Sequence, residues 1–201
     1  MSRASGFLLT IEGVDAVGKK TQSRLLNSRF RLKHLKIKLL AFPDYTTPIG
    51  KEIKAFLGGN RNYPPDLMHI LFAANRWEKR EELRSLLGEG NTVIVNRYTE
   101  SNLVYGKANG LSLEWLANLE NGLPKSDLVI VLDAPPTFLA SRRSVNKDVY
   151  EADLRLQERV RKTYRELARK FRWVIIDATG NVETVHRRIL KAVSAEIPRL
   201  D

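Results

Sequence analysis

Near its N-terminus the chain reads Gly13-Val14-Asp15-Ala16-Val17-Gly18-Lys19-Lys20-Thr21. An apolar run at residues 7–11 precedes this stretch, and a segment predicted to be helical, residues 22–29, follows it. Two glycines with four residues between them and a lysine next, placed between a strand and a helix, are typical of a loop that binds nucleotide phosphates. The glycines allow a tight turn that gathers backbone N–H groups, and the helix N-terminus adds partial positive charge. The sequence therefore predicts a phosphate-binding loop rather than a structural turn, with Lys19 reaching the terminal phosphates.

The apolar runs along the chain predict the fold. They lie at residues 7–11, 37–42, 92–96, 128–133 and 173–177. Helical patterns separate them, at residues 22–29, 49–57, 66–87, 112–121, 136–143, 151–170 and 182–194. Strands that alternate with helices predict a single α/β domain over residues 1–201, with a five-stranded parallel sheet and helices on both faces. Ligands of such sheets bind at the carboxyl ends of the strands.

The composition excludes several classes of protein. The chain is 43% hydrophobic and 28% charged, as a globular protein is, and it has no cysteine for disulfides, thiolate metal sites or thiol nucleophiles. No apolar run approaches the roughly 20 residues of a membrane span. The first six residues are too short and too polar for a signal peptide, so we expect a cytoplasmic protein.

The net charge of +11 raises the question of nucleic acid as a partner. Residues 141–172 carry eleven Lys and Arg against five Asp and Glu, but their helical period indicates a solvated basic face without interleaved aromatic side chains. We therefore expect no specific nucleic-acid binding. The three histidines, His34, His69 and His186, lack metal-ligand spacing and are interpreted as structural or surface residues.

Arg97 and the pair Phe72 and Arg76 are candidates for binding from position alone. Arg97 follows a predicted strand, where its guanidinium would suit a second phosphate, although a surface salt bridge is the alternative. Phe72 and Arg76 are four residues apart on one helix face, distinct from the main apolar stripe. They could hold a flat base, or they could be a core Phe beside a solvated Arg.

Several further motifs combine into a family resemblance. The matching pieces are Glu12-Gly13-Val14-Asp15, Gly18-Lys19 with Thr21-Gln22, Phe42-Pro43, Leu71-Phe72-Ala73-Ala74-Asn75-Arg76-Trp77-Glu78, Arg97-Tyr98 with Ser101 and Tyr105, Gly122-Leu123-Pro124-Lys125-Ser126-Asp127, and Tyr150-Glu151. Together they resemble the thymidylate kinases, P-loop nucleoside monophosphate kinases that phosphorylate dTMP, over nearly the whole chain, from Phe7 to about Leu190.

The resemblance implies an ATP site. Its expected residues are Gly13, Val14, Asp15, Ala16, Val17, Gly18, Lys19, Lys20, Thr21, Arg142 and Thr179. Thr179 belongs to a loop that would bracket adenine, and residues 141–150 would form a lid. Some family members carry an arginine inside the phosphate loop; Ala16 and Val17 leave none here, so Arg142 and Arg143 of the lid would contact the transferring phosphoryl group.

The resemblance also implies a dTMP site. Its expected residues are Asp15, Phe42, Tyr45, Phe72, Arg76, Arg97, Ser101, Asn102, Tyr105 and Tyr150. Phe72 would stack on thymine and Arg76 would bind its carbonyl oxygen, with Ser101 and Asn102 completing the pocket. Asp15 would accept a hydrogen bond from the 3′-hydroxyl, and Tyr105 and Tyr150 would crowd the 2′ position.

The implied chemistry needs no covalent nucleophile, because the acceptor phosphate is already an anion. Catalysis then consists of positioning and of neutralising charge on the moving phosphoryl group. The expected catalytic residues are Lys19, Arg97, Arg142, Arg143 and Asp15. Lid closure would also exclude water.

Three residues depart from the family pattern. Lys20 replaces the usual hydroxyl that binds Mg²⁺, Asn96 replaces an acid, and Tyr45 replaces a phosphate-binding arginine of many members. We hypothesise that Lys20 supplies part of the charge neutralisation that Mg²⁺, the expected cofactor, normally gives. Asp15, or the phosphates alone, would then hold the ion.

The favoured function is an ATP:dTMP phosphotransferase. The resemblance also implies a homodimer packed through helices that include the one from Asp66, where the sequence itself shows only unexplained apolar residues. One alternative is a kinase for a wider range of deoxynucleoside monophosphates, because one methyl group discriminates only modestly. Another is a non-catalytic nucleotide- or nucleic-acid-binding protein.

Overall fold

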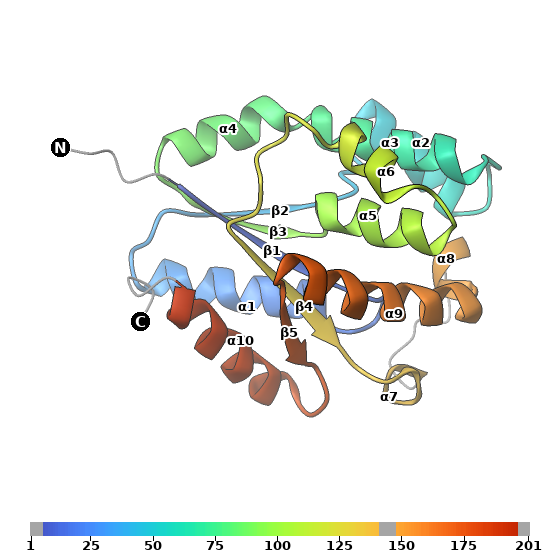
Figure 1. Ribbon diagram of the computed structural model, residues 1–201. Coiled ribbons are helices and arrows are strands. Elements are labelled where there is room, and N and C mark those ends of the chain that lie inside the picture. Colours follow the sequence, from blue (N-terminus) through green and yellow to red (C-terminus); the bar gives the residue numbers. More distant parts are fainter. Residues whose placement is uncertain (1–5, 141–147, 197–201) are drawn as a thin grey trace.

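The part of the chain that the computed structural model describes, residues 6–140 and 148–196, folds around one five-stranded parallel sheet (Figure 1). Its strands are β1 (Phe7–Gly13), β2 (Ile37–Ala41), β3 (Thr92–Asn96), β4 (Leu128–Asp133) and β5 (Val174–Asp177). They are arranged in the order β2-β3-β1-β4-β5, so β1 is central and pairs with β3 and β4. The predicted α/β fold with a five-stranded parallel sheet is confirmed.

Side chains alternate between the two faces of the sheet, and helices cover both faces. On one face Leu9 shares a buried cluster with Leu26 of α1 (Lys19–Leu32), and α10 (Val182–Glu196) packs beside α1. On the other, Leu8 packs with Leu83 of α4 (Arg80–Gly88). Two further helices, α5 (Thr99–Ala108) and α9 (Leu154–Phe171), pack together on the same face as Leu8. Glu12 of β1, whose side chain lies on that face, accepts hydrogen bonds from both helices.

The remaining helices lie outside these layers or at their ends. They are α2 (Pro48–Leu57), α3 (Pro65–Trp77), α6 (Leu113–Leu119), α7 (Pro136–Ala140) and α8 (Val149–Ala152). Helix α3 packs against α2 and α5, above the carboxyl ends of β2 and β3 (Figure 1). Within the described ranges, no helix is long and apolar enough to cross a membrane.

The prediction of a single helix at residues 66–87 is wrong, because this segment forms two helices, α3 and α4, separated by Glu78 and Lys79. The two halves pack against different partners, α3 on α2 and α5 and α4 on β3, so the chain must change direction. Two residues near the break also contact the loop after β2. Lys79 Nζ lies 3.3 Å from Asp44 Oδ2, and Asn75 Oδ1 accepts a hydrogen bond from Asp44 N at 2.8 Å. No glycine or proline marks this break.

The predicted helix at 151–170 is also two helices, α8 and α9, separated at Asp153, whose carboxylate caps α9 by accepting from Leu156 N at 2.9 Å. Helix α5 was not predicted at all. Its buried residues include Glu100, Asn102 and Tyr105, so it lacks the apolar stripe by which a helix against a sheet is recognised.

Candidate active site

The predicted phosphate loop lies between the end of β1 at Gly13 and the start of α1 at Lys19. Gly13 has a φ of 134°, and a Cβ at this position would lie 2.4 Å from the carbonyl oxygen of Leu132, so only glycine fits. Lys19 Nζ donates to the carbonyl oxygens of Gly13 and Val14, at 3.0 and 2.8 Å. The loop therefore wraps around its own lysine at the N-terminus of a helix.

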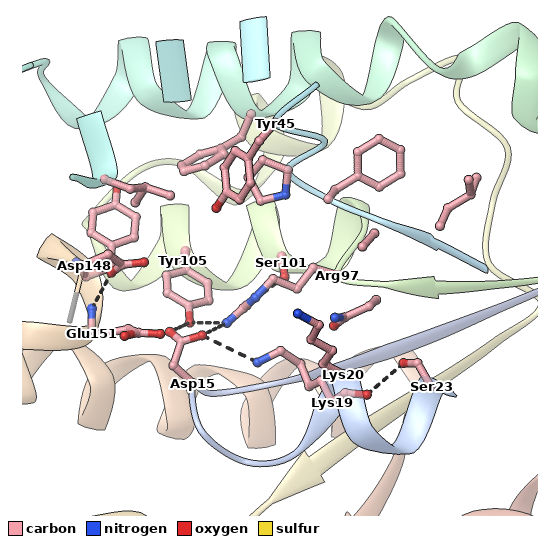
Figure 2. Close-up of a pocket in the computed structure, with 18 of the residues that line it drawn as sticks. Asp15, Lys19, Lys20, Ser23, Tyr45, Arg97, Ser101, Tyr105, Asp148 and Glu151 are labelled. Atoms are coloured by element: carbon pink, nitrogen blue, oxygen red, sulfur yellow. Dashed lines mark hydrogen bonds and ion pairs between the residues drawn. The ribbon is translucent and has the colours of Figure 1, made fainter. Parts of the chain in front are cut away.

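Asp15, in the loop, binds the groups that converge on it from across the site (Figure 2). Its Oδ1 accepts from Arg97 Nη2 and lies 3.6 Å from Lys19 Nζ. Its Oδ2 accepts from the Tyr105 hydroxyl at 3.0 Å and from Gln157 Nε2 at 3.2 Å. Burial alone would raise the pKa of Asp15, but the charges of Arg97 and Lys19 outweigh it and hold the pKa well below its ordinary value. Asp15 is therefore ionised over the whole physiological range.

The surroundings of Lys19 destabilise its positive charge. Burial, together with the charge of Arg97, lowers the pKa of Lys19 to about 8, although Asp15 opposes the shift. A polyanion bound beside Lys19 would raise this pKa again and stabilise the charged form. The loop therefore has the electrostatic character of an anion-binding site.

An unusual backbone turn after β3 orients the side chain of Arg97. Its φ of 63° is in the left-handed region, which costs roughly 1–2 kcal/mol for a residue with a side chain. The buried carboxylate of Glu12 holds the turn: Oε1 accepts from Tyr98 N at 2.8 Å, and Oε2 accepts from the hydroxyls of Ser101 and Tyr164, each at 2.7 Å. Ser101 Oγ in turn accepts from Arg97 Nη1 at 3.2 Å.

A cavity of about 860 Å³ opens beyond this ion pair. Aromatic rings form one wall: Tyr105 and Tyr150 stack with centroids 5.9 Å apart, and Phe72 lies 6.3 Å from Tyr150. Tyr45, from the loop after β2, also points into the cavity (Figure 2). Arg97 lies over the ring of Tyr105, 5.1 Å from its centroid, so the cationic and aromatic parts of the site are continuous.

Arg76 is buried in a polar network rather than solvated, so the alternative of a solvated arginine is excluded. It is 4% exposed, and Glu120 accepts from its Nε at 2.9 Å and from its Nη2. Asn102 Nδ2 also donates to Glu120, at 2.6 Å, and Asn102 Oδ1 lies 2.6 Å from His69 Nδ1. Burial lowers the pKa of His69 to about 4, so this imidazole is neutral and its Nδ1 proton is donated to Asn102.

The structure gathers most of the predicted site residues around the cavity. Among the described residues that line it are Asp15, Ala16, Gly18, Lys19, Lys20, Thr21, Phe42, Tyr45, Phe72, Arg76, Arg97, Ser101, Asn102, Tyr105 and Tyr150. The side chains of Val14 and Val17 are buried, and Thr179 binds Asp177 in the loop after β5, outside this lining. Arg142 and Arg143 lie outside the described residues, so the roles expected of them stay predictions.

The candidate site also contains supporting residues to which the sequence analysis gave no role in it. His69 contacts Asn102 and Glu120 binds Arg76, while Glu12 holds the turn after β3 and Gln157 donates to Asp15. Glu12 follows an apolar run and so could have been recognised as a buried acid at a strand end. Gln157 and Glu120 have no local signal, since only the tertiary structure brings Gln157 to Asp15 and Glu120 to Arg76.

The place where a phosphate loop normally holds Mg²⁺ does not fit a metal bound by protein side chains. The usual ligands are a hydroxyl after the loop lysine and a nearby acid, but here the positions hold Lys20 and Asn96. Asp15 is already bonded to Arg97, Tyr105 and Gln157. In the described parts of the chain, no three His, Cys, Asp or Glu residues gather as metal ligands would.

Comparison with known proteins agrees with this geometry. A family model described as thymidylate kinase matches residues 11–189. The chain belongs to the thymidylate kinase family. The thymidylate kinase of Schizosaccharomyces pombe is 37% identical over 194 residues, covering 94% of this chain and 92% of that protein. The human thymidylate kinase is 34% identical over 192 residues, with 94% and 90% covered. A solved structure of thymidylate kinase from Candida albicans has a TM-score of 0.84 and 28% identity, and covers 98% of this chain and 94% of its own.

The pair of Arg76 and Glu120 predicts a measurable coupling. Glu120→Gln should lower the free energy of unfolding by about 3 kcal/mol, because it leaves a buried guanidinium without its counter-charge. Replacing both partners, with Arg76→Met added, should restore more than half of that loss. Urea unfolding measures Glu120→Gln, Arg76→Met and the double variant beside Glu114→Gln, an exposed control on α6 that should change stability by less than about 0.5 kcal/mol. If the loss of unfolding free energy in the double variant equals the sum of the losses in the two single variants, the two residues are not coupled and the prediction is contradicted.

Proposed function

We propose that this protein transfers the γ-phosphoryl group of ATP to the 5′-phosphate of dTMP, giving ADP and dTDP. The observation that carries the proposal is the contact between Asp15 and Arg97, which joins the phosphate loop to the aromatic cavity. The two halves of a phosphotransferase site are thereby held together by a contact within the protein. Such preorganisation is the main source of rate in phosphoryl transfer.

The donor side is the loop around Lys19. Its backbone N–H groups, the N-terminus of α1 and the ammonium of Lys19 suit the phosphates of ATP. The acceptor phosphate would lie against Arg97, whose fork binds phosphate in bidentate fashion. Asp15 lies between these cations and keeps two positive charges close enough to flank one transferring group.

The acceptor side suits a pyrimidine deoxynucleotide. Phe72 offers an aromatic face, and the N–H groups of Arg76 that Glu120 leaves free would bind a carbonyl oxygen such as O4 of thymine. Cytosine presents an amino group at that position, so two donors would meet. Tyr105 and Tyr150, stacked beside Asp15, would leave little room for a 2′-hydroxyl.

The remaining parts of the expected mechanism stay proposals. Arg142 and Arg143 would close over the transferring phosphoryl group, and Thr179 would bracket adenine. ATP is expected to bring Mg²⁺, which would neutralise phosphate charge, but the side chains at its usual place do not fit the ion. A cytoplasmic location and the lack of specific nucleic-acid binding also stay predictions, to be checked by cell fractionation and by salt-dependent gel shifts.

A broader substrate range is the second candidate. The solved relative from Candida albicans is described as having broad substrate specificity. Thymine differs from uracil by one methyl group, which a pocket distinguishes by only about 1–3 kcal/mol. A binding protein without catalysis is disfavoured, because simple nucleotide binding does not need the second phosphate clamp that Arg97 supplies.

We also propose that the protein is a homodimer that packs through α3. Three large apolar side chains of α3 are exposed in the single chain: Leu67, Ile70 and Trp77 are 37%, 42% and 38% exposed. Because these residues recur on one face of a helix, they favour burial against a second copy. Sedimentation equilibrium should give about twice the chain mass of 22.9 kDa, and Ile70→Glu should shift the protein toward monomer. A wild-type monomer at micromolar concentration would contradict this.

The activity itself is tested by a coupled assay with ATP and each of dTMP, dUMP, dCMP, dGMP, dAMP and UMP. We expect dTMP to give the highest kcat/KM, dUMP to follow within about 10- to 200-fold, and dCMP and UMP to be far weaker. Comparable rates for all the deoxynucleotides would favour the broad-range kinase. Turnover of none would contradict the proposed function.

A further inference from the structure

Lys20 is a cation of the active-site cavity that the described protein does not neutralise. It is the second residue of α1 and is exposed, and its side chain reaches from the start of the helix into the cavity (Figure 2). Lys19 lies near Asp15, Arg97 is paired with Asp15, and Arg76 is paired with Glu120. For Lys20 the described residues provide no ion-pair partner. Its charge is therefore available to a bound anion.

Asn96 strengthens this conclusion from the neighbouring strand. It ends β3 immediately before Arg97 and also lines the cavity, and its Oδ1 is buried without a hydrogen-bond partner among the described residues. Phosphate-loop enzymes commonly use an acid near this place to hold Mg²⁺. An acid here would also attract Lys20 away from a phosphate. The neutral amide leaves the ammonium free.

The two residues together change the charge where a metal ion normally lies. A hydroxyl is replaced by a positive charge at Lys20, and a carboxylate is replaced by a neutral amide at Asn96. Both changes disfavour a divalent cation, and both favour a polyphosphate without one. A single substitution could be incidental, but two that act in the same direction at one place indicate a different arrangement of charge.

We propose that Lys20 is a resident counter-charge for the ATP phosphates, which takes over part of the role of Mg²⁺ and lets this protein bind metal-free ATP. The inference rests on the proposed ATP site. The ammonium contacts a terminal phosphate oxygen from the helix N-terminus, while Lys19 occupies the loop. One monovalent cation replaces a divalent one only in part, so metal dependence is reduced rather than abolished.

ATP binding, measured calorimetrically with excess EDTA and again with Mg²⁺, tests the proposal without requiring turnover. Wild-type protein should bind metal-free ATP within about threefold of its affinity for Mg–ATP. Lys20→Ser should weaken metal-free ATP by about tenfold or more, the value of one lost charge-assisted contact, and should weaken Mg–ATP much less. Lys20→Arg, which keeps the charge, should retain most of the metal-free affinity.

A double variant, Lys20→Ser with Asn96→Asp, restores the usual pair of residues at the metal position. It should bind ATP only when Mg²⁺ is present, while its circular dichroism matches that of the wild type. If Lys20→Ser weakens both forms of ATP equally, or leaves metal-free binding unchanged, Lys20 is not a counter-charge and the inference is wrong. If wild-type protein binds Mg–ATP but not metal-free ATP, the inference about Lys20 is wrong and the proposed function still stands. If it binds neither form, the proposed function fails as well.

Discussion

The site depends on one carboxylate, Asp15, shared by two cations. Lys19 and Arg97 approach it from different elements, the start of α1 and the end of β3. Without the negative charge these two groups would repel each other in a largely buried place, where unpaired charges are costly. Even with it, burial and the charge of Arg97 together lower the pKa of Lys19 to about 8. Two cations share one carboxylate, and a bound phosphate would balance the remaining positive charge.

Neighbouring residues hold this carboxylate and its partners through contacts within the protein. Gln157 of α9 and Tyr105 of α5 donate to Asp15, and Glu12 of β1 holds the left-handed turn that aims Arg97. These contacts come from elements far apart in the sequence but adjacent at the carboxyl edge of the sheet. The fold itself thus supplies the contacts that hold the site together.

The sequence predicts the parts of this protein that follow local rules. The strands, the glycine-containing loop between β1 and α1, and the shared helix face of Phe72 and Arg76 depend on residues close together in the chain, and the structure has each of them at the predicted place. Helix α5 was missed because polar side chains such as Asn102 face the site, which removes the amphipathic period. The break between α3 and α4 and the partners Glu120 and Gln157 depend on tertiary contacts, which no local pattern encodes.

The most direct test of this account is the kcat of Asp15→Asn for dTMP phosphorylation, measured beside the wild type at saturating ATP and dTMP. The substitution keeps the shape of the side chain and removes its charge. We predict a loss of about 10²–10³-fold in a protein that is still folded, because Lys19 and Arg97 are no longer held together around the transferring group. A kcat within about threefold of the wild type would contradict the central role of this carboxylate.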